Sequence, residues 1–358
     1  MAKSSTRKIY VGGVPVGGGS PIMVQSMTNT DTRNIEATAA QIGRLAAKGC
    51  EVVRVAVPDM AACSSFKQIT GLSPVPLVAD IHFDWRLAVA SMESGAGGVR
   101  INPGNIGSES NIKRVIDAAK SNNCVIRIGV NSGSIKKNIL AKYGHPTPEA
   151  MVESALENID FFEKQGFYNL KISIKSSSVL DTIKAYRLIH AKCNYPLHLG
   201  VTEAGGGIRG TVKSSIGLGI LLAEGIGDTI RVSLTDYPER EVEVAWEILR
   251  SLNLRHHGPE IISCPTCGRT EIDLFSMVSA IEKMVVDCKQ PIKIAVMGCV
   301  VNGPGEAREA DIGVAGGKDM GIIFKKGKVI GSAKGDKAIL EYFEKELQAL
   351  LEENSKTK

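Results

Sequence analysis

The chain has 358 residues, which is long enough for two domains or for one large barrel with a smaller module attached. Charged residues make up 23% and hydrophobic residues 43%, as in ordinary soluble proteins, and a net charge of +5 is too small to favour nucleic-acid binding. We expect no membrane span and a cytoplasmic location, because the sequence has no apolar run of about 18 residues and no signal-peptide core after Met1.

Short runs of apolar and β-branched residues recur through roughly the first 240 residues. Successive runs begin about 20 to 45 residues apart, which is the spacing of one strand, one helix and two loops per unit. Eight such units in series predict a closed (β/α)8 barrel, the TIM-barrel form of an α/β fold, over residues 1–252. The predicted strands are Ile22–Met27, Val52–Val57, Leu77–Phe83, Gly98–Asn102, Val125–Val130, Leu170–Lys175, Leu197–Thr202 and Thr229–Leu234.

The segments between these runs have helical periodicity. Residues Ile35–Lys48 carry apolar side chains at helical spacing and end before Gly49, a residue that suits a helix end. Residues Pro148–Gln165 follow a capping residue, Thr147, and have proline at the first helical position. Ahead of the first strand, Lys8–Gly17 is predicted to form a small hairpin that covers the bottom of the barrel.

The pattern changes after about residue 255, where strands no longer alternate strictly with helices. Such an order predicts a small α+β domain over residues 260–358. Its later strands are expected to form a meander, with the basic segment Phe324–Lys328 at a hairpin tip. The predicted strands are Ile261–Ser263, Ile292–Met297, Asp311–Ala315, Gly321–Phe324 and Lys328–Gly331, and the predicted helices are Glu271–Cys288 and Asp336–Glu352.

Charged and polar residues gather at the ends of the predicted barrel strands, where the chemistry of such barrels is found. Each one alone is equally well explained as a solvated or locally paired side chain, but a barrel interior is normally aliphatic, and several cations there repel one another unless an anion or carboxylates compensate. Guanidinium groups match phosphate oxygens, so the set predicts a site for a small, multiply charged anion such as a phosphate or diphosphate. The set comprises Arg54, Asp80, His82, Arg100, Asn102, Arg127, Asn131, Lys171, Ser173, Lys175, Glu203, Arg231 and Ser233.

Two acids stand among these cations, Asp80 and Glu203. Each is a candidate general acid–base or a simple countercharge. The loop that follows Glu203 contains Gly205–Gly210 and matches the pattern G-x-G-x-x-G. A dinucleotide site would need an open βαβ sheet with an acidic residue at the end of the next strand, whereas Asp228 precedes its strand. A flexible or phosphate-facing loop is therefore favoured.

Three of the 8 cysteines, Cys264, Cys267 and Cys299, each follow a predicted strand in turn-rich sequence. They are one short of the four thiolates that usually hold an iron–sulfur cluster, which would leave one iron open to a weaker ligand. Zinc with His256 or His257 as fourth ligand is a second interpretation, and a redox thiol pair is a third. The remaining cysteines are expected to be mostly ordinary buried thiols, because a cytoplasmic protein rarely forms disulfides.

Glu306 lies seven residues after Cys299, beyond a glycine–proline turn. That turn allows the chain to fold back and bring the Glu306 carboxylate to the same metal centre. The alternative is an acid at the start of a helix, where the helix dipole favours negative charge. The two roles are compatible.

Six motifs of the chain, taken together, point to one family. They are Cys264–Arg269, Met297–Ala307, Asp80–Phe83, Arg100–Asn105, Arg127–Asn131 and Thr202–Gly205. Together they resemble the hydroxymethylbutenyl diphosphate synthase family, the iron–sulfur enzymes of the methylerythritol phosphate route to isoprenoids. The resemblance extends through nearly the whole chain, and the two cysteine motifs in combination are highly specific. It implies that 2-C-methyl-D-erythritol 2,4-cyclodiphosphate is opened reductively to (E)-4-hydroxy-3-methylbut-2-enyl diphosphate, with loss of water and two electrons consumed.

The same resemblance implies the roles of individual residues. One 4Fe-4S cluster per chain would be bound by Cys264, Cys267, Cys299 and Glu306, with Glu306 as the replaceable ligand that gives way to substrate. Glu203 would be the proton donor. The implied substrate-binding residues are Arg54, Asp80, His82, Arg100, Asn102, Arg127, Asn131, Lys175, Arg231, Ser233 and Asn302.

The resemblance also implies partners. Electrons would come from reduced flavodoxin or ferredoxin, and a head-to-tail homodimer would place the cluster of one chain at the barrel of the other. Two alternatives remain: a pterin-type transferase barrel with a structural zinc domain, which would use the anion site without electrons, and a non-catalytic iron–sulfur electron carrier. The carrier would need no charged strand ends and would more usually have four thiolates.

Overall fold

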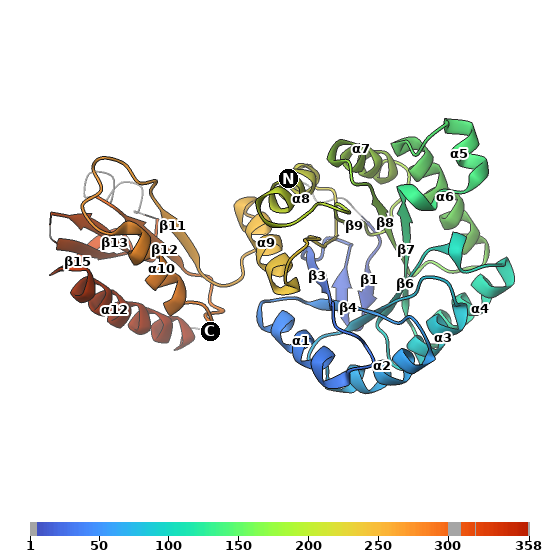
Figure 1. Ribbon diagram of the computed structural model, residues 1–358, viewed down its shortest axis with the longest axis horizontal. Helices are drawn as coiled ribbons and strands as arrows, with labels where there is room; N and C mark the ends of the chain where they lie inside the picture. The colour runs from blue at the N-terminus through green and yellow to red at the C-terminus, as the bar shows by residue number, and fades with distance from the viewer. Residues whose placement is uncertain (1–5, 300–308, 319, 357–358) are drawn as a thin grey trace. The chain divides into compact units, whose positions relative to one another are not determined.

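The computed structural model describes residues 6–299, 309–318 and 320–356. The chain divides into two compact units, Met1–Arg255 and His256–Lys358, which are drawn in Figure 1. Within the described residues, no helix is both long enough and apolar enough to cross a membrane.

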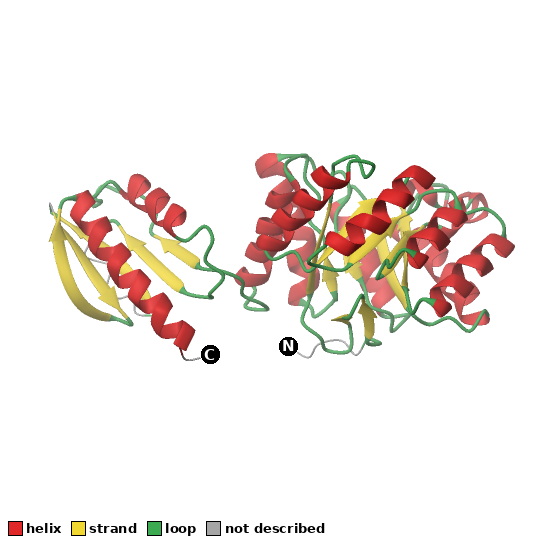
Figure 2. Cartoon of the chain, turned by 90° about the horizontal axis from the view of Figure 1, so that it is seen from below, coloured by secondary structure: helices red, strands yellow, loops and turns green. Residues whose placement is uncertain are grey.

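The first unit is the predicted (β/α)8 barrel. Its strands are all parallel and run in the order β8-β7-β6-β5-β4-β3-β10-β9, and a bridge between Ile172 and Leu197 joins β8 to β9. Figure 2 shows the strands enclosed by helices. The bounds are β3 Met23–Met27, β4 Val52–Ala56, β5 Leu77–Asp80, β6 Gly98–Ile101, β7 Val125–Asn131, β8 Leu170–Lys175, β9 His198–Leu199 and β10 Thr229–Ile230.

The last two strands, β9 and β10, are much shorter than the predicted Leu197–Thr202 and Thr229–Leu234. After β9 the chain enters Gly200, whose α-carbon faces the Lys175 ammonium. After β10 the backbone N–H of Leu234 donates to the carboxylate of Glu241 at 3.0 Å instead of to a neighbouring strand. The backbone N–H groups of Thr202 and Arg231 still donate to neighbouring strand segments, at 3.3 Å to Ser176 O and 3.0 Å to Leu199 O, so the pairing becomes irregular beyond the short strands.

In the described part of this unit, residues 6–255, nine α-helices alternate with the strands or extend a connection. Helix α1 begins after Asn34, whose side chain accepts a hydrogen bond from Ala37 N at 3.0 Å, and α6 begins after Thr147, as its sequence predicts. The short α5 lies in the connection between β7 and α6 and was not predicted. The bounds are α1 Ile35–Ala47, α2 Met60–Leu72, α3 Trp85–Glu93, α4 Glu109–Ser121, α5 Lys137–Tyr143, α6 Pro148–Lys164, α7 Val179–His190, α8 Gly207–Ala223 and α9 Pro238–Ser251.

The predicted hairpin closes the bottom of the barrel. Strands β1 (Ile9–Val11) and β2 (Val14–Val16) pair antiparallel. Their buried side chains form one apolar cluster with residues from the first parts of four barrel strands. The cluster contains Ile9, Val11, Val16, Met23, Val52, Val78 and Val125, so the amino-terminal end of the barrel has an apolar floor.

The described residues of the second unit include a mixed sheet whose five strands lie in sequence order, β11 to β15. The predicted meander is confirmed for β13, β14 and β15, whereas β11, β12 and β13 run parallel, an arrangement that was not predicted. The bounds are β11 Glu260–Ser263, β12 Lys293–Met297, β13 Ile312–Gly317, β14 Met320–Lys325 and β15 Lys328–Lys334.

Among the residues of this unit that the structure describes, two α-helices pack against the sheet. Helix α10 (Leu274–Met284) is shorter than the predicted Glu271–Cys288, because Asp273 caps its first turn by accepting from Ser276 N at 3.1 Å. Helix α12 (Asp336–Lys356) extends past the predicted end at Glu352. Both helices bury apolar side chains against β12 and β13, which gives this unit a core of its own.

Candidate active site

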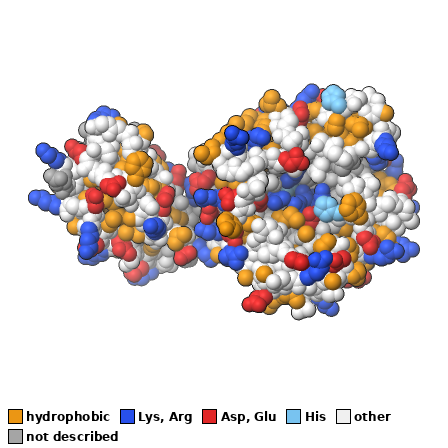
Figure 3. Space-filling model, viewed as in Figure 1, with side chains coloured by type: hydrophobic (Ala, Val, Ile, Leu, Met, Phe, Trp, Pro, Cys, Tyr) orange, Lys and Arg blue, Asp and Glu red, His pale blue; other side chains and the backbone are white. Residues whose placement is uncertain are grey.

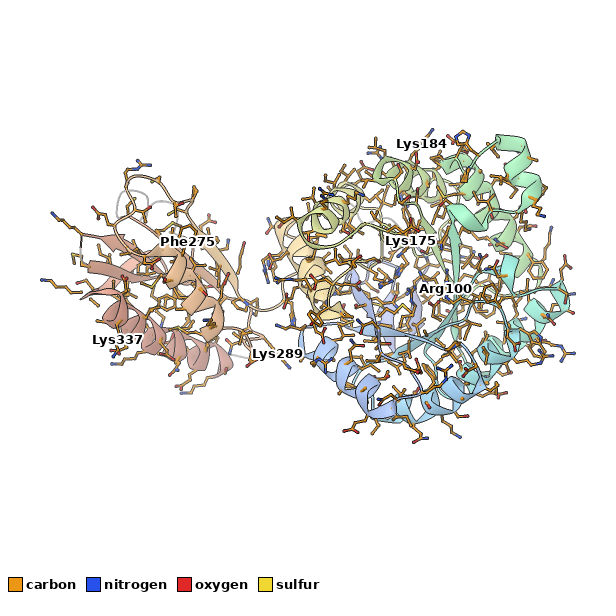
Figure 4. All side chains as sticks on the ribbon, viewed as in Figure 1. Arg100, Lys175, Lys184, Phe275, Lys289 and Lys337 are labelled. Carbon is orange, nitrogen blue, oxygen red and sulfur yellow. The ribbon has the colours of Figure 1, made fainter. Side chains whose placement is uncertain are left out.

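The charged strand ends lie inside the barrel. The register pairs Asp80 with Arg100, Arg100 with Arg127, and Asn131 with Lys175 across β5 to β8. Paired residues of parallel neighbours point to the same side of the sheet, so these side chains share the interior. Figure 4 places Arg100 and Lys175 within the ring of strands, and Figure 3 shows Lys and Arg side chains gathered at the centre of this unit.

Asp80 is the countercharge on one side of this group. It is 4% exposed, and its carboxylate accepts from Arg100 Nη1 at 3.1 Å and lies 3.6 Å from Arg54 Nε and 3.5 Å from His82 Nε2. Burial alone would raise the pKa of Asp80, but Arg54, the His82 hydrogen bond and Arg100 hold that pKa well below its ordinary range. Asp80 is therefore a permanent anion that organises its cations, and its geometry suits a countercharge better than a proton donor.

The cations outnumber the acids that face them. These cations, called the cation group below, are Arg54, Arg100, Arg127, Lys175 and Arg231. Burial and the neighbouring Arg231 and Arg100 lower the pKa of Arg54 to about 10, although Asp80 acts in the opposite direction. Burial and the adjacent arginines lower the pKa of Arg127 and of Lys175 well below their ordinary values. A group of buried like charges with depressed pKa values is stabilised by any anion that enters it.

Three guanidinium groups present donors without partners. The Nε–H groups of Arg100, Arg127 and Arg231 are buried, and none has a hydrogen-bond partner among the described residues. An unpaired buried donor costs about 1–3 kcal/mol, and more when the group is charged. Arg100 and Arg127 lie on the adjacent strands β6 and β7, and Arg231 follows β10. Three such donors inside one barrel make a site whose polar groups are satisfied by an anion with several oxygens.

Two glycines make room for the cations, and sequence inspection did not single them out. A side chain at Gly129 would place its Cβ 3.0 Å from Arg100 Nε, so the guanidinium lies directly over β7. A side chain at Gly200 would meet the Lys175 ammonium. Both glycines occupy positions where a barrel strand normally has an inward-facing side chain. A glycine at such a position is the sequence signal that could have indicated a close approach by another group.

A second polar layer shares the interior. Lys171 is 1% exposed and His198 is fully buried. The Lys171 Nζ and both ring nitrogens of His198 have no hydrogen-bond partner among the described residues. Burial and the nearby Arg127 lower the pKa of Lys171 to about 7 and that of His198 well below its usual value. The histidine is neutral, so this layer is polar while adding little positive charge.

The other predicted residues of the barrel occupy varied positions. The Asn102 side chain accepts from Gly104 N at 3.2 Å and so caps a single 3₁₀ turn, Pro103–Asn105. His82 is exposed beside Asp80, and Ser233 is half-buried just beyond β10. Glu203 is exposed after β9 and has φ of +54°, a left-handed backbone that is rare outside glycine. Strain of this kind is commonly found at functional positions.

The glycine-rich loop leads from a strand of a closed barrel into a helix. Gly206 precedes α8, and the loop and its helix therefore belong to an ordinary βα unit. The dinucleotide interpretation required an open sheet, and the closed barrel does not supply one.

The two described cysteine segments meet at one edge of the second unit's sheet. Strand β11 pairs with β12, with Ser263 opposite Val296, so Cys264 and Cys299 both follow the carboxyl ends of adjacent parallel strands. Gly298 N donates to the Cys264 sulfur at 3.1 Å, and Glu271 N donates to Gly298 O at 2.9 Å. The CxxC loop and the Cys299 loop are thus tied together.

Cys267 is the exposed thiol of the three. Hydrogen bonds from the Arg269 backbone and side chain lower the pKa of Cys267, and Arg269 also interacts with Cys299. A lowered thiol pKa beside a cation favours the thiolate, which is the form that binds metal. By contrast, burial raises the pKa of Cys50 and of Cys124 to about 12, as expected for inert thiols.

Over the described ranges, no three His, Cys, Asp or Glu side chains lie close enough together to hold a metal ion. Asn302 and Glu306, predicted at this site, lie outside the described residues. The donor chemistry nevertheless fits a metal centre: three free thiols on two tethered loops, one with a lowered pKa.

Comparison with known families assigns the chain. One family model, the GcpE TIM-barrel domain, matches residues 6–246, and a second, the GcpE protein C-terminal domain, matches residues 260–349. The chain belongs to the GcpE family. Family membership thus covers both the charged barrel and the cysteine unit.

Two curated relatives match over nearly their full lengths. A protein of Lawsonia intracellularis named 4-hydroxy-3-methylbut-2-en-1-yl diphosphate synthase (flavodoxin) is 61% identical over 355 residues, which is 99% of each chain. A protein of the same name from Maridesulfovibrio salexigens is 60% identical over 98% of each chain. Among solved structures, a dihydropteroate synthase from Stenotrophomonas maltophilia with bound imidazole has a TM-score of 0.50 at 14% identity, covering 69% of this chain and 98% of that one. This likeness concerns the barrel fold alone.

Proposed function

We propose that the chain catalyses the reaction named for its relatives. The reaction is the reductive opening of 2-C-methyl-D-erythritol 2,4-cyclodiphosphate to (E)-4-hydroxy-3-methylbut-2-enyl diphosphate in isoprenoid biosynthesis. GcpE family membership supports this oxidoreductase and gives no support to a pterin-type transferase or a non-catalytic electron carrier. The observation that carries the proposal is the set of unpartnered Nε–H donors of Arg100, Arg127 and Arg231 in the barrel.

The barrel interior is the proposed diphosphate site. Diphosphate oxygens would accept from the arginine donors and from Lys175, relieving the repulsion that depresses the pKa values of these cations. Asp80 would fix Arg54 and Arg100 in place. The proposed substrate-binding set comprises Arg54, Asp80, His82, Arg100, Asn102, Arg127, Asn131, Lys175, Arg231, Ser233 and Asn302.

Glu203 is the proposed proton donor. Its exposure after β9 leaves the carboxyl free to face a substrate, and its left-handed backbone supports a role that requires a fixed direction. Loss of an oxygen as water needs a proton, and a carboxylic acid is a common source. Replacement of Glu203 by Gln is expected to lower kcat strongly while leaving substrate binding nearly unchanged.

One 4Fe-4S cluster per chain is the proposed cofactor, bound by Cys264, Cys267, Cys299 and Glu306. Such a cluster passes one electron at a time, and the reaction consumes two. Arg269, beside Cys267 and Cys299, would stabilise the thiolate ligands by its charge. Glu306→Ala is expected to retain some cluster and lose most turnover, and unchanged activity would remove Glu306 from the site.

Flavodoxin is the donor printed in the names of the relatives, and we propose it as the physiological reductant in preference to ferredoxin. A homodimer in which one chain's cluster serves the other chain's barrel is also proposed, on the resemblance described above. Crosslinking between barrel and cysteine unit, followed by assignment of each crosslink to one chain or two, tests this arrangement.

Anaerobic purification with iron and sulfide counts and a visible spectrum tests the proposed function most directly. Iron and acid-labile sulfide near four per chain, together with turnover of the cyclodiphosphate by reduced flavodoxin, are the expected results. Stoichiometric zinc without sulfide would overturn the cluster, and an intact cluster without turnover would overturn the substrate.

A further inference from the structure

Glu241 is a buried acid that belongs to none of the groups described above. It lies on α9, outside the strands, and is only 4% exposed. A buried carboxylate is costly unless charges and hydrogen bonds compensate it. The groups that contact the Glu241 carboxylate therefore indicate its role.

Those partners come from three directions. Ser26 Oγ on β3 donates to Glu241 Oε2 at 2.8 Å, and the Leu234 backbone N–H donates to Oε1 at 3.0 Å. Arg231 Nη2 lies 3.3 Å from Oε1 and 3.4 Å from Oε2. The carboxylate thus joins β3, the segment after β10 and α9, with Arg231 as the charged member.

One nitrogen of the Arg231 guanidinium is hydrogen-bonded, and another has no partner among the described residues. Nη2 is on Glu241, while the buried Nε–H has no partner among the described residues. A guanidinium is planar, so fixing one nitrogen by a two-oxygen contact restricts the direction of the other donors. The unpaired Nε–H is consequently presented to the interior in a limited range of orientations.

The charge of Glu241 has a second effect. Arg54 and Lys175 are both disfavoured as cations by Arg231, and Glu241 acts on Arg54 in the opposite sense. Asp80 compensates Arg54 and Arg100 on one side of the cation group, and Glu241 compensates Arg231 on the other. Two buried acids on different elements thus each pair with part of the cation group.

We propose that Glu241 is a positioning residue for anion binding, which acts by fixing the Arg231 guanidinium with its Nε–H toward the diphosphate. This inference rests on the proposed diphosphate site. Removing the carboxylate has two opposite effects: it takes away a negative charge, which favours an anion, and it frees Arg231 to reorient, which disfavours one. The inference is that orientation outweighs charge.

A double-mutant cycle on the holoenzyme separates these effects, with inorganic pyrophosphate as the probe and calorimetry as the readout. Glu241→Gln is expected to weaken pyrophosphate binding roughly tenfold, and Arg231→Met at least as much. In the Arg231→Met background, Glu241→Gln is expected to cause no further loss. In turnover assays, KM should rise by a similar factor while kcat changes little.

A matched control lies two residues along the same helix. Glu243 is 36% exposed and pairs with Lys48 and Arg240 at the surface, so Glu243→Gln should leave pyrophosphate affinity unchanged. Should Glu241→Gln fail to fold, Ser26→Ala removes one donor to the same carboxylate without altering charge, and a smaller loss that also vanishes in the Arg231→Met background is expected.

The outcomes are distinguishable. Unchanged or tighter pyrophosphate binding by Glu241→Gln, alongside weakened binding by Arg231→Met, overturns the inference and leaves the diphosphate site standing. An equal loss in both backgrounds means that Glu241 supports the fold alone, which also overturns it. If Arg231→Met binds pyrophosphate normally, Arg231 does not belong to the diphosphate site, and the inference about Glu241 falls with that assignment.

Discussion

The cation group of the barrel and the cysteine edge of the second unit (Cys264, Cys267 and Cys299) differ in how their side chains are held. In the barrel, the cationic side chains are largely buried, and Asp80 and Glu241 hold their arginine partners at 3.1–3.6 Å. At the cysteine edge, two backbone N–H groups tie the described loops, one of them by donating to the Cys264 sulfur, and the Cys267 thiol is exposed. The barrel side chains are therefore fixed before a ligand binds, whereas the proposed cluster would draw the three thiols together.

The largest effect is expected at the cysteine edge, because the proposed cluster has three thiolate ligands and the loss of one weakens its binding strongly. Cys264→Ser should lose the cluster and at least about 100-fold of the turnover. Pyrophosphate affinity of the same variant should be close to that of the parent protein, since the barrel is a separate compact unit. Iron counts and calorimetry on one preparation check both. Retention of cluster by this variant would place the ligands elsewhere.

In the barrel, Arg127→Ala is expected to lower ligand affinity and to raise thermal stability. Substrate and pyrophosphate binding should weaken by roughly 30- to 100-fold, because a buried charged donor is lost. The free protein should become more stable to heat, since the buried arginines that lower one another's pKa values are then fewer. Calorimetric binding and thermal unfolding without ligand measure the two. Unaltered pyrophosphate affinity would contradict the diphosphate assignment.

Lys171 provides a pH test of the polar layer. Its ordinary pKa of 10.5 falls to about 7 in the folded chain. Between these values the unfolded chain binds more protons, so stability rises with pH through this window and is lowest below about pH 7. Lys171→Met should stabilise the protein at pH 7 by on the order of 2 kcal/mol and flatten the rise. Chemical denaturation at pH 7 and pH 9 checks this, and exposed Lys164→Met is the control.

The smallest predicted effect is that of Gly129→Ala on pyrophosphate affinity, which tests how tightly the Arg100 guanidinium packs against β7. Gly129→Ala puts a methyl group 3.0 Å from Arg100 Nε, so the guanidinium must shift by a few tenths of an ångström. A loss of pyrophosphate affinity of about threefold is expected. Gly133→Ala, where a Cβ meets nothing within 4 Å, is the matched control. Equal affinities for the two variants would indicate a more adaptable site than the contacts suggest.

Sequence reasoning predicted the parts of this structure that depend on local pattern. The strand runs, the helix predicted at Ile35–Lys48, the helix capped by Thr147 and the hairpin predicted at Lys8–Gly17 follow from periodicity and turn chemistry. The cation group was predictable because polar residues at strand ends must meet once the barrel closes.

What escaped prediction depends on contacts between distant segments. Glu241 sits on an amphipathic helix among Glu239, Glu243 and Glu247, and nothing local marks it as the buried one. The parallel pairing of β11 to β13 was missed because short apolar runs carry no sign of strand direction. The burial of Lys171 and His198 likewise depends on the closed ring, not on their neighbours in sequence.

The hairpin floor makes the two ends of the barrel chemically different. Ile9, Val11 and Val16 pack with the first parts of the strands, so apolar side chains line the amino-terminal end. Arg100 is the last residue but one of β6 and Lys175 is the last residue of β8, so both lie at the opposite end. The barrel therefore has a polarity along its axis, from apolar side chains at one end to buried cations toward the other.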